Sequence, residues 1–205
     1  MLIQPIDDDP ERNFNEDEKR VLTKNLEGLI REVRTAESKN LDYVPQLFQS
    51  WHYRLFNGVR SHAGKYRSRD YGEPTLVFGG HRSAHRDNVA SELELHSKRG
   101  RKMMGELKEK ESLINRKEFI SEAIMSALFL HALFIKIHPF RDGNGRVGRL
   151  IITYTLSRFN IPPISFEVPK QEYINCLDDF YRNNCTNIRC LYELAIRIYK
   201  NQLDV

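Results

Sequence analysis

The segment from residue 117 to residue 137 constrains the fold of this chain more than any other. Apolar residues occur nearly all round a helix drawn over it, which is typical of a helix buried on most sides. At 1.5 Å per residue it would be about 30 Å long, enough to run through the middle of a small domain. Its longest uncharged run, Ala123 to Ile135, is 13 residues and too short to span a bilayer. We therefore expect a buried central helix and no membrane segment.

The rest of the chain predicts further helices around this one. Apolar residues recur at helical spacing over 17–34 and 43–57, and again from near Asp87 and over 145–159, 170–182 and 187–201. Turn residues flank one short strand candidate, Thr75-Leu76-Val77-Phe78. With 205 residues, 40% of them hydrophobic, the chain can bury a core and is not a disordered class. The predicted fold class is mostly α, a helical bundle with one small β-hairpin.

The cysteines and the first residues predict a cytoplasmic protein. Cys176, Cys185 and Cys190 are odd in number and contain no CxxC pair. We therefore expect neither a zinc site nor a disulfide framework, and we treat all three as packing residues in a reducing compartment. The first five residues are followed by acids, so no signal peptide is expected. The sequence leaves self-association open.

The net charge of +4 is unevenly distributed. A cluster of +4 lies at 98–102, but no aromatic residues are interleaved with it and Glu106 to Glu111 restore the balance. We interpret this cluster as a solvated linker, and nucleic acid is not an expected partner. His81 and His85 have i, i+4 spacing beside Asp87, yet the glycines around them favour loop residues over a metal site.

The loop that follows the central helix carries residues suited to phosphate chemistry. Gly143 and Gly145 let consecutive N–H groups curl into an anion nest, and the next helix begins there with its positive end at the same point. Arg146 and Arg149 are three residues apart and share a face of that helix. They can bind further phosphates bidentately.

Two more residues complete this set. Asp142 lies among the phosphate-binding groups, where a hard divalent cation is expected. His138 ends the central helix beside the nest, where a general base would lie. The run 143–148 also matches GxGxxG, but no strand precedes it, and a P-loop would need Gly-Lys-Ser/Thr. The loop therefore predicts a nucleotide polyphosphate with Mg²⁺ and a hydroxyl to be deprotonated.

This loop resembles the signature of the Fic family, HxFx(D/E)GNGRxxR. All eight fixed positions match, from His138 through Phe140 and Asp142 to the run Gly143-Asn144-Gly145-Arg146 and Arg149. The resemblance implies a Fic-fold bundle and a catalytic domain over 37–205. It also implies a protein adenylyltransferase that moves AMP from ATP, with Mg²⁺, to a Ser, Thr or Tyr hydroxyl of a target protein.

The resemblance implies a role for each matched position. His138 would deprotonate the target hydroxyl, and Asp142 would hold Mg²⁺ on the α- and β-phosphates. The run Gly143-Asn144-Gly145 would bind the α-phosphate, Arg146 the β-phosphate and Arg149 the γ-phosphate. Catalysis of this kind rests on positioning and electrostatic stabilisation.

A second stretch also looks like the family. Leu47-Phe48 and Ala63-Gly64-Lys65-Tyr66-Arg67 are similar to its LF…WAGxxR segment, with His62 in place of the Trp. The resemblance implies that Phe140 anchors the motif loop in the core. It also implies that Thr75 to Phe78 belong to a flap that pairs with the target by strand addition.

The N-terminal helix contains Thr23-Lys24-Asn25-Leu26-Glu27-Gly28, which matches the family's inhibitory motif (S/T)xxxE(G/N). Thr23 and Glu27 share a helix face, and Gly28 inside a helix suggests a close backbone approach. The resemblance implies that residues 1–36 form an inhibitory segment. In it, Glu27 would pair with Arg149 and block placement of the γ-phosphate.

Other interpretations stay open. A Fic-fold enzyme could use another nucleotide or remove AMP, and a nucleotide-sensing or DNA-binding regulator could use the 98–102 cluster without any catalysis. His131 lies seven residues before His138 and is expected to be a hydrogen-bonded core residue. Tyr173 and Tyr181 would either border the adenine pocket or pack between helices.

Overall fold

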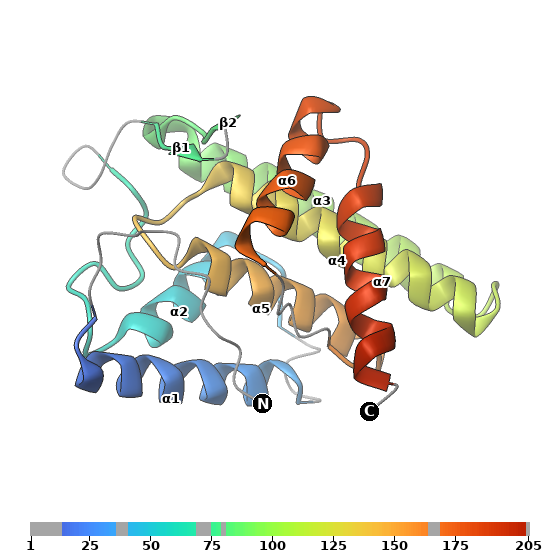
Figure 1. The fold of residues 1–205 in the computed structure, drawn as a ribbon, viewed down its shortest axis with the longest axis horizontal. Helices are drawn as coiled ribbons and strands as arrows, with labels where there is room; N and C mark the ends of the chain where they lie inside the picture. The colour runs from blue at the N-terminus through green and yellow to red at the C-terminus, as the bar shows by residue number, and fades with distance from the viewer. Residues whose placement is uncertain (1–13, 36–40, 69–74, 79–80, 164–168, 204–205) are drawn as a thin grey trace.

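A computed structural model describes residues 14–35, 41–68, 75–78, 81–163 and 169–203 (Figure 1). Seven α-helices and one two-stranded antiparallel hairpin lie within these ranges, which confirms the predicted fold class. The helices are α1 Glu16–Val33, α2 Pro45–Phe56, α3 Val89–Lys110, α4 Arg116–Ile137, α5 Asn144–Ser157, α6 Lys170–Arg182 and α7 Arg189–Leu203. A 3-10 turn, η2 Arg86–Asn88, leads into α3.

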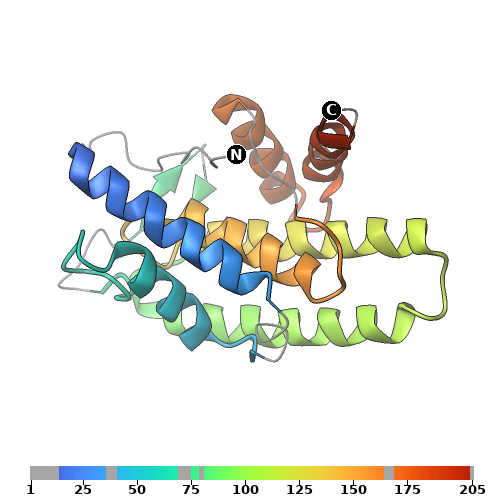
Figure 2. The same cartoon turned by 90° about the horizontal axis from the view of Figure 1, so that it is seen from below.

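The central helix is α4, as the apolar segment predicts. It packs against α3, α5 and α7, and α3 and α4 run side by side for most of their length (Figure 2). By length and composition α4 could cross a membrane, and no other helix in the described ranges could. In this fold its apolar side chains lie in the core, where Ala123, Ala127 and Phe134 are fully buried.

Helix α5 follows the motif loop and is buried along its whole length. Gly148 lets it approach α4 closely, because a Cβ there would lie 2.8 Å from His131 Nδ1. The other ring nitrogen of His131 forms a 2.6 Å hydrogen bond with the hydroxyl of Tyr173. The prediction of a hydrogen-bonded core histidine is therefore confirmed, and Tyr173 is buried between helices.

Helix α1 packs its apolar side against α2 and α5. Asn15 and Glu18 form a reciprocal capping box that starts the helix, and Leu22, Leu29 and Val33 are its buried residues. The expected close approach at Gly28 is wrong, because a Cβ there would meet nothing within 4 Å. The glycine lies on a part of the helix where the neighbouring elements leave space.

The 98–102 cluster is not a linker but part of the continuous helix α3. Its four charged residues are exposed, whereas Gly100 is buried against the ring of Tyr43. A Cβ at Gly100 would lie 2.2 Å from Tyr43 Cε1. The side chain of Arg101 donates a 2.8 Å hydrogen bond to the Tyr43 carbonyl. Gly100 is therefore a packing glycine inside a helix, and the expected linker is wrong.

Cys176 and Cys190 form a disulfide that joins α6 to α7, and Cys185 is free. The expectation of three unpaired cysteines is wrong. The two helices pack side by side and bring the Cα atoms within 5.2 Å, although 14 residues separate them in the sequence. An odd count says nothing about which pair the fold brings together.

The strand that forms is shorter than the four residues predicted. β1 comprises Val77–Phe78 and pairs with β2, His81–Arg82, in the register Val77 to Arg82. Thr75 precedes the strand, and Leu76 extends the pairing through two 2.9 Å hydrogen bonds, from its N–H to Ser83 Oγ and from the Ser83 N–H to its carbonyl. Val77 is 69% exposed, so the hairpin presents a side chain to solvent.

Candidate active site

The site begins at His138, the residue that ends α4. Its backbone is left-handed, with φ 52° and ψ 59°, and its N–H donates to the Phe134 carbonyl at 3.0 Å. A non-glycine residue in this region costs about 1–2 kcal/mol, and such strain is found at functional sites. Pro139 follows and stops the helix. The imidazole of His138 is buried, with the residue 7% exposed.

Arg67 holds this strained turn in place. Its Nε donates to the His138 carbonyl at 2.7 Å, and its own main-chain N–H donates to the Pro139 carbonyl at 2.8 Å. One terminal nitrogen also bonds Ser83 Oγ at 3.2 Å and the Ala84 carbonyl at 2.9 Å. A single buried guanidinium therefore ties the motif loop to the segment that follows the hairpin.

Phe140 anchors the loop, as the resemblance implies. Its ring is fully buried and stacks on His52, with centroids 3.9 Å apart and planes 7° apart. Its N–H donates to Asn144 Oδ1, and its carbonyl accepts from Asn144 Nδ2, both at 2.9 Å. The side chain of Asn144 thus holds the loop closed. A contribution of Asn144 to phosphate binding therefore rests on its main-chain N–H at the start of α5.

Gly143 caps the N-terminus of α5 with a left-handed φ of 71°. A Cβ at this position would lie 2.3 Å from Phe56 Cε2, so the close packing of α2 requires glycine. Its carbonyl accepts the N–H of Val147 at 3.0 Å, which starts the helix. The first N–H groups of α5, including that of Gly145, point out of the N-terminal end of the helix, where an anion is favoured.

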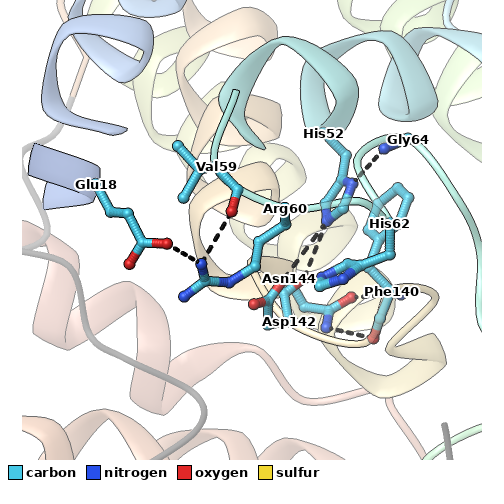
Figure 3. Close-up of polar contacts among 9 residues, drawn as sticks. All are labelled: Glu18, His52, Val59, Arg60, His62, Gly64, Phe140, Asp142 and Asn144. Carbon is cyan, nitrogen blue, oxygen red and sulfur yellow. Dashed lines mark hydrogen bonds and ion pairs between the residues drawn. The ribbon is translucent and has the colours of Figure 1, made fainter. Parts of the chain in front are cut away.

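Asp142 is 4% exposed and lies against two buried histidines (Figure 3). Nε2 of His62 is 3.2 Å from Oδ1 of Asp142. Nε2 of His52 is 3.2 Å from the Asp142 carbonyl and 3.8 Å from Oδ1. Burial lowers the pKa of His52, with contacts to Asp142 acting in the opposite direction. His52 was not among the predicted site residues, because nothing in its local sequence places it beside Asp142.

Both motif arginines are buried, with Arg146 5% and Arg149 9% exposed. The Cζ of Arg146 lies 5.6 Å from the ring centroid of Phe14 and 5.7 Å from that of Phe56. Aromatic rings over a guanidinium leave its in-plane N–H groups for an anion. Phe14 lies two residues before α1, so the segment that leads into the N-terminal helix contributes to the surroundings of Arg146.

A second contact joins the start of α1 to the same region. Arg60 lies 4.3 Å from the Phe14 ring and donates hydrogen bonds to Glu18 at 2.5 Å and to the Val59 carbonyl at 2.9 Å (Figure 3).

The predicted pair of Glu27 with Arg149 is not formed. Glu27 and Thr23 are exposed on the outer side of α1, whereas Arg149 is buried. The helix turns its residues 22, 29 and 33 inward instead.

The other histidines singled out lie outside this loop. His81, in β2, has its Nε2 3.1 Å from Asp178 Oδ1 of α6 and packs edge-on against Tyr181. His85 starts the 3-10 turn and lies 3.6 Å from Asp87. Within the described ranges, no three His, Cys, Asp or Glu side chains gather as a metal site.

The residues present nevertheless fit a nucleotide-bound Mg²⁺. This ion is usually held in enzymes by one or two carboxylates, waters and substrate phosphates rather than by a cage of side chains. Asp142 offers one buried carboxylate, two residues before the N-terminal turn of α5. A hard oxygen ligand beside a helix N-terminus, where an anion is favoured, has the chemistry that this ion requires.

Comparison with known proteins agrees with this geometry. A Fido domain-containing protein of Dictyostelium discoideum is 36% identical over 87 residues, which cover 39% of this chain and 60% of that protein. The protein adenylyltransferase Fic of Aedes aegypti is 40% identical over 55 residues, 26% of this chain and 11% of that protein. The matched segments thus span less than two thirds of these relatives.

Solved structures share the fold over most of the chain. A Fic domain-containing signaling protein of Bacteroides thetaiotaomicron has a TM-score of 0.65 at 18% identity, covering 93% of this chain and 71% of that one. BepC of Bartonella tribocorum, solved with bound AMPPNP, has a TM-score of 0.55 at 17% identity, covering 86% and 85%. The family model of the Fic/DOC family matches residues 40–156. This chain therefore belongs to the Fic/DOC family.

Proposed function

We propose that this chain is a protein adenylyltransferase that transfers AMP from ATP to a side-chain hydroxyl of a target protein. One observation carries the proposal. His138 and the phosphate-binding start of α5 belong to a single buried loop, whose conformation is fixed by Arg67, by Phe140 and by the glycine at position 143. The base and the phosphate site are therefore held in a fixed relation before substrates arrive.

The reaction follows from the residues in this loop. The imidazole of His138 takes the proton of the target hydroxyl as its oxygen attacks the α-phosphorus of ATP. A bond forms between that oxygen and the α-phosphorus, the bond to the bridging α,β-oxygen breaks, and pyrophosphate leaves with the electron pair. The N–H groups at the start of α5 stabilise the charge that develops on the α-phosphoryl group.

Arg146 and Arg149 bind the charge of the leaving pyrophosphate. Both lie on the first two turns of α5, so their guanidinium groups follow the N–H nest along one helix face. Asp142 would hold Mg²⁺, which neutralises charge on the phosphates when it is bound. Support for the nucleotide comes from BepC, a relative in fold that was solved with bound AMPPNP.

The hairpin is the proposed docking element for the target. β1 and β2 have only two paired residues each, and Val77 is largely exposed. An extended target segment could add to such an edge through main-chain hydrogen bonds. Arg67 contacts Ser83 and Ala84, just after the hairpin, and also the loop that carries His138. A target held on the hairpin is thus held relative to the base.

The test is transfer of label from ATP to protein. Purified chain and its His138→Ala variant are incubated with cell lysate and with ATP labelled either at the α- or at the γ-phosphate, with Mg²⁺ or with EDTA. Compared with lysate alone, we expect added protein labelling from the α-label only, dependent on Mg²⁺ and lost in the variant, which should still bind ATP.

Two outcomes would contradict the proposal. Protein labelling from the γ-phosphate above that of lysate alone would show phosphoryl transfer instead, and full labelling by His138→Ala would remove His138 from its role. GTP, CTP and UTP with the same α-label, run in parallel, identify the donor nucleotide.

A further inference from the structure

We propose that His62 and His52 are positioning residues that orient Asp142 toward the metal–nucleotide complex. The inference rests on the proposed function and deepens it, because it assigns two residues outside the 138–149 motif to the same site. Both come from the chain segment of α2 and the loop that follows it, and their rings are 6.3 Å apart. Figure 3 shows the two rings side by side at Asp142.

His52 is fixed at three points. Its Nδ1 accepts the N–H of Gly64 at 2.8 Å, and its ring stacks on Phe140 at 3.9 Å. Because a main-chain N–H can only donate, Nδ1 must be unprotonated, and the neutral ring carries its proton on Nε2. Nε2 therefore donates to the Asp142 carbonyl at 3.2 Å. The main chain of Asp142 is held by a histidine whose own tautomer is set by the backbone.

His62 acts on the side chain of the same residue. Its Nε2 lies 3.2 Å from Oδ1 of Asp142, and the residue is only 6% exposed. One contact to the carbonyl and one to the carboxylate restrict both the backbone and the χ angles of Asp142. A carboxylate held through Oδ1 presents Oδ2 on a defined side.

Such control matters more for Mg²⁺ than for packing. The ion demands near-octahedral geometry at about 2.0–2.1 Å, and Asp142 is the carboxylate that would hold it here. Partners that orient a metal ligand typically change metal affinity by about 10–100-fold when they are removed. A residue that only filled space would change stability, and it would not change the gain in ATP affinity that Mg²⁺ provides.

The experiment uses two substitutions of similar shape. His62→Gln keeps a side-chain N–H donor, and His62→Met fills the same space without one. In each variant, the Kd of ATP is measured by calorimetry with Mg²⁺ and with EDTA, in the full chain carrying His138→Ala so that no transfer occurs. The quantity compared is the ratio of the two Kd values, which is the gain from Mg²⁺.

We expect His62→Met to lower this gain by about 10-fold or more, with the Kd in EDTA changed less than about twofold. His62→Gln should keep most of the gain. If His62→Met does not fold by circular dichroism, His62→Asn replaces it, because its amide is too short to reach Oδ1. An unchanged gain in His62→Met or His62→Asn would overturn the proposal.

The result is separable from failure of the proposed function. If wild-type chain transfers AMP and gains affinity from Mg²⁺ while the variants keep that gain, only the positioning role fails. If wild-type chain transfers AMP but binds ATP with no gain in affinity from Mg²⁺, the positioning role is also overturned, and the proposed transfer activity stands. If it neither gains affinity from Mg²⁺ nor transfers AMP, the proposed function fails as well.

Discussion

Replacing Gly143 by alanine tests the packing that shapes the motif loop. The residue has a φ of 71°, where alanine costs about 1–2 kcal/mol more than glycine. A Cβ would also lie 2.3 Å from Phe56 Cε2 and 2.8 Å from Phe56 Cζ, and forcing such an overlap costs about 1–3 kcal/mol. Together we expect Gly143→Ala to lower the free energy of unfolding by about 2–5 kcal/mol.

Gly28→Ala is the matched control, because the chemical change is the same. Gly28 is inside α1, its φ is not positive, and a Cβ would meet nothing within 4 Å. Alanine is favoured over glycine inside a helix by about 0.5–1 kcal/mol, so this variant should be stabilised. The same glycine-to-alanine change is thus expected to lower the free energy of unfolding at position 143 and to raise it at position 28.

The assay is thermal unfolding followed by far-ultraviolet circular dichroism, with transfer of the α-label measured in parallel. For a chain of this size, 1 kcal/mol corresponds to about 2–4 °C in Tm. Gly143→Ala should therefore lower Tm by about 4–20 °C, and Gly28→Ala should raise it by about 1–4 °C. Adding Phe56→Leu to Gly143→Ala should recover part of the loss, because the smaller side chain relieves the overlap. Equal Tm values for the two alanine variants, or no coupling with Phe56, would refute the reasoning.

The other predictions follow from single contacts. Arg67→Met should lower the free energy of unfolding by about 3–6 kcal/mol in urea titrations, because two short bonds to carbonyls are lost at about 1.5–3 kcal/mol each. Phe14→Ala should raise the Kd of ATP severalfold in calorimetry, because Arg146 loses one ring that holds it; an unchanged Kd would contradict this. Glu27→Gly should leave label transfer within about twofold, since Glu27 is exposed; a large rise would show that it reaches the site in another arrangement. Burial lowers the pKa of His96 to about 4 from 6.5, so the unfolded chain takes up the proton first. Stability should fall as the pH drops from 6.5 toward 4, and His96→Gln should flatten that slope in unfolding measured at several pH values.

The helices could be predicted well because their periodicity is a local property. The expected range 17–34 differs from α1 by one residue at each end. The expected range 117–137 differs from α4 by one residue at its start and agrees at its end. The residues of the 138–149 motif could be predicted equally well, since the chemistry of each depends on its own residue type. These residues are close together in the sequence, so their proximity in the fold is expected as well.

What could not be predicted depends on elements far apart in the chain. Glu27 matches a short motif, but the face that a helix turns inward is decided by its leucines, and those point Glu27 to solvent. The pairing of Cys176 with Cys190 needs α6 and α7 side by side. His52 touches Asp142 across 90 residues of sequence, so no pattern in its neighbourhood could identify it.

The residues that hold the motif loop therefore form a set of their own. His52, His62, Gly64 and Arg67 come from one stretch of the chain, and each contacts the loop at 138–142 or a residue that does. The loop has little regular structure, with a strained residue at its start and a glycine cap at its end, so its own sequence does not fix its shape. Substitutions in the stretch 52–67 should then reduce transfer without touching a single phosphate-binding residue. The similarity to the family's second segment is explained by the same contacts, because His62, Gly64 and Arg67 of that segment support the motif loop.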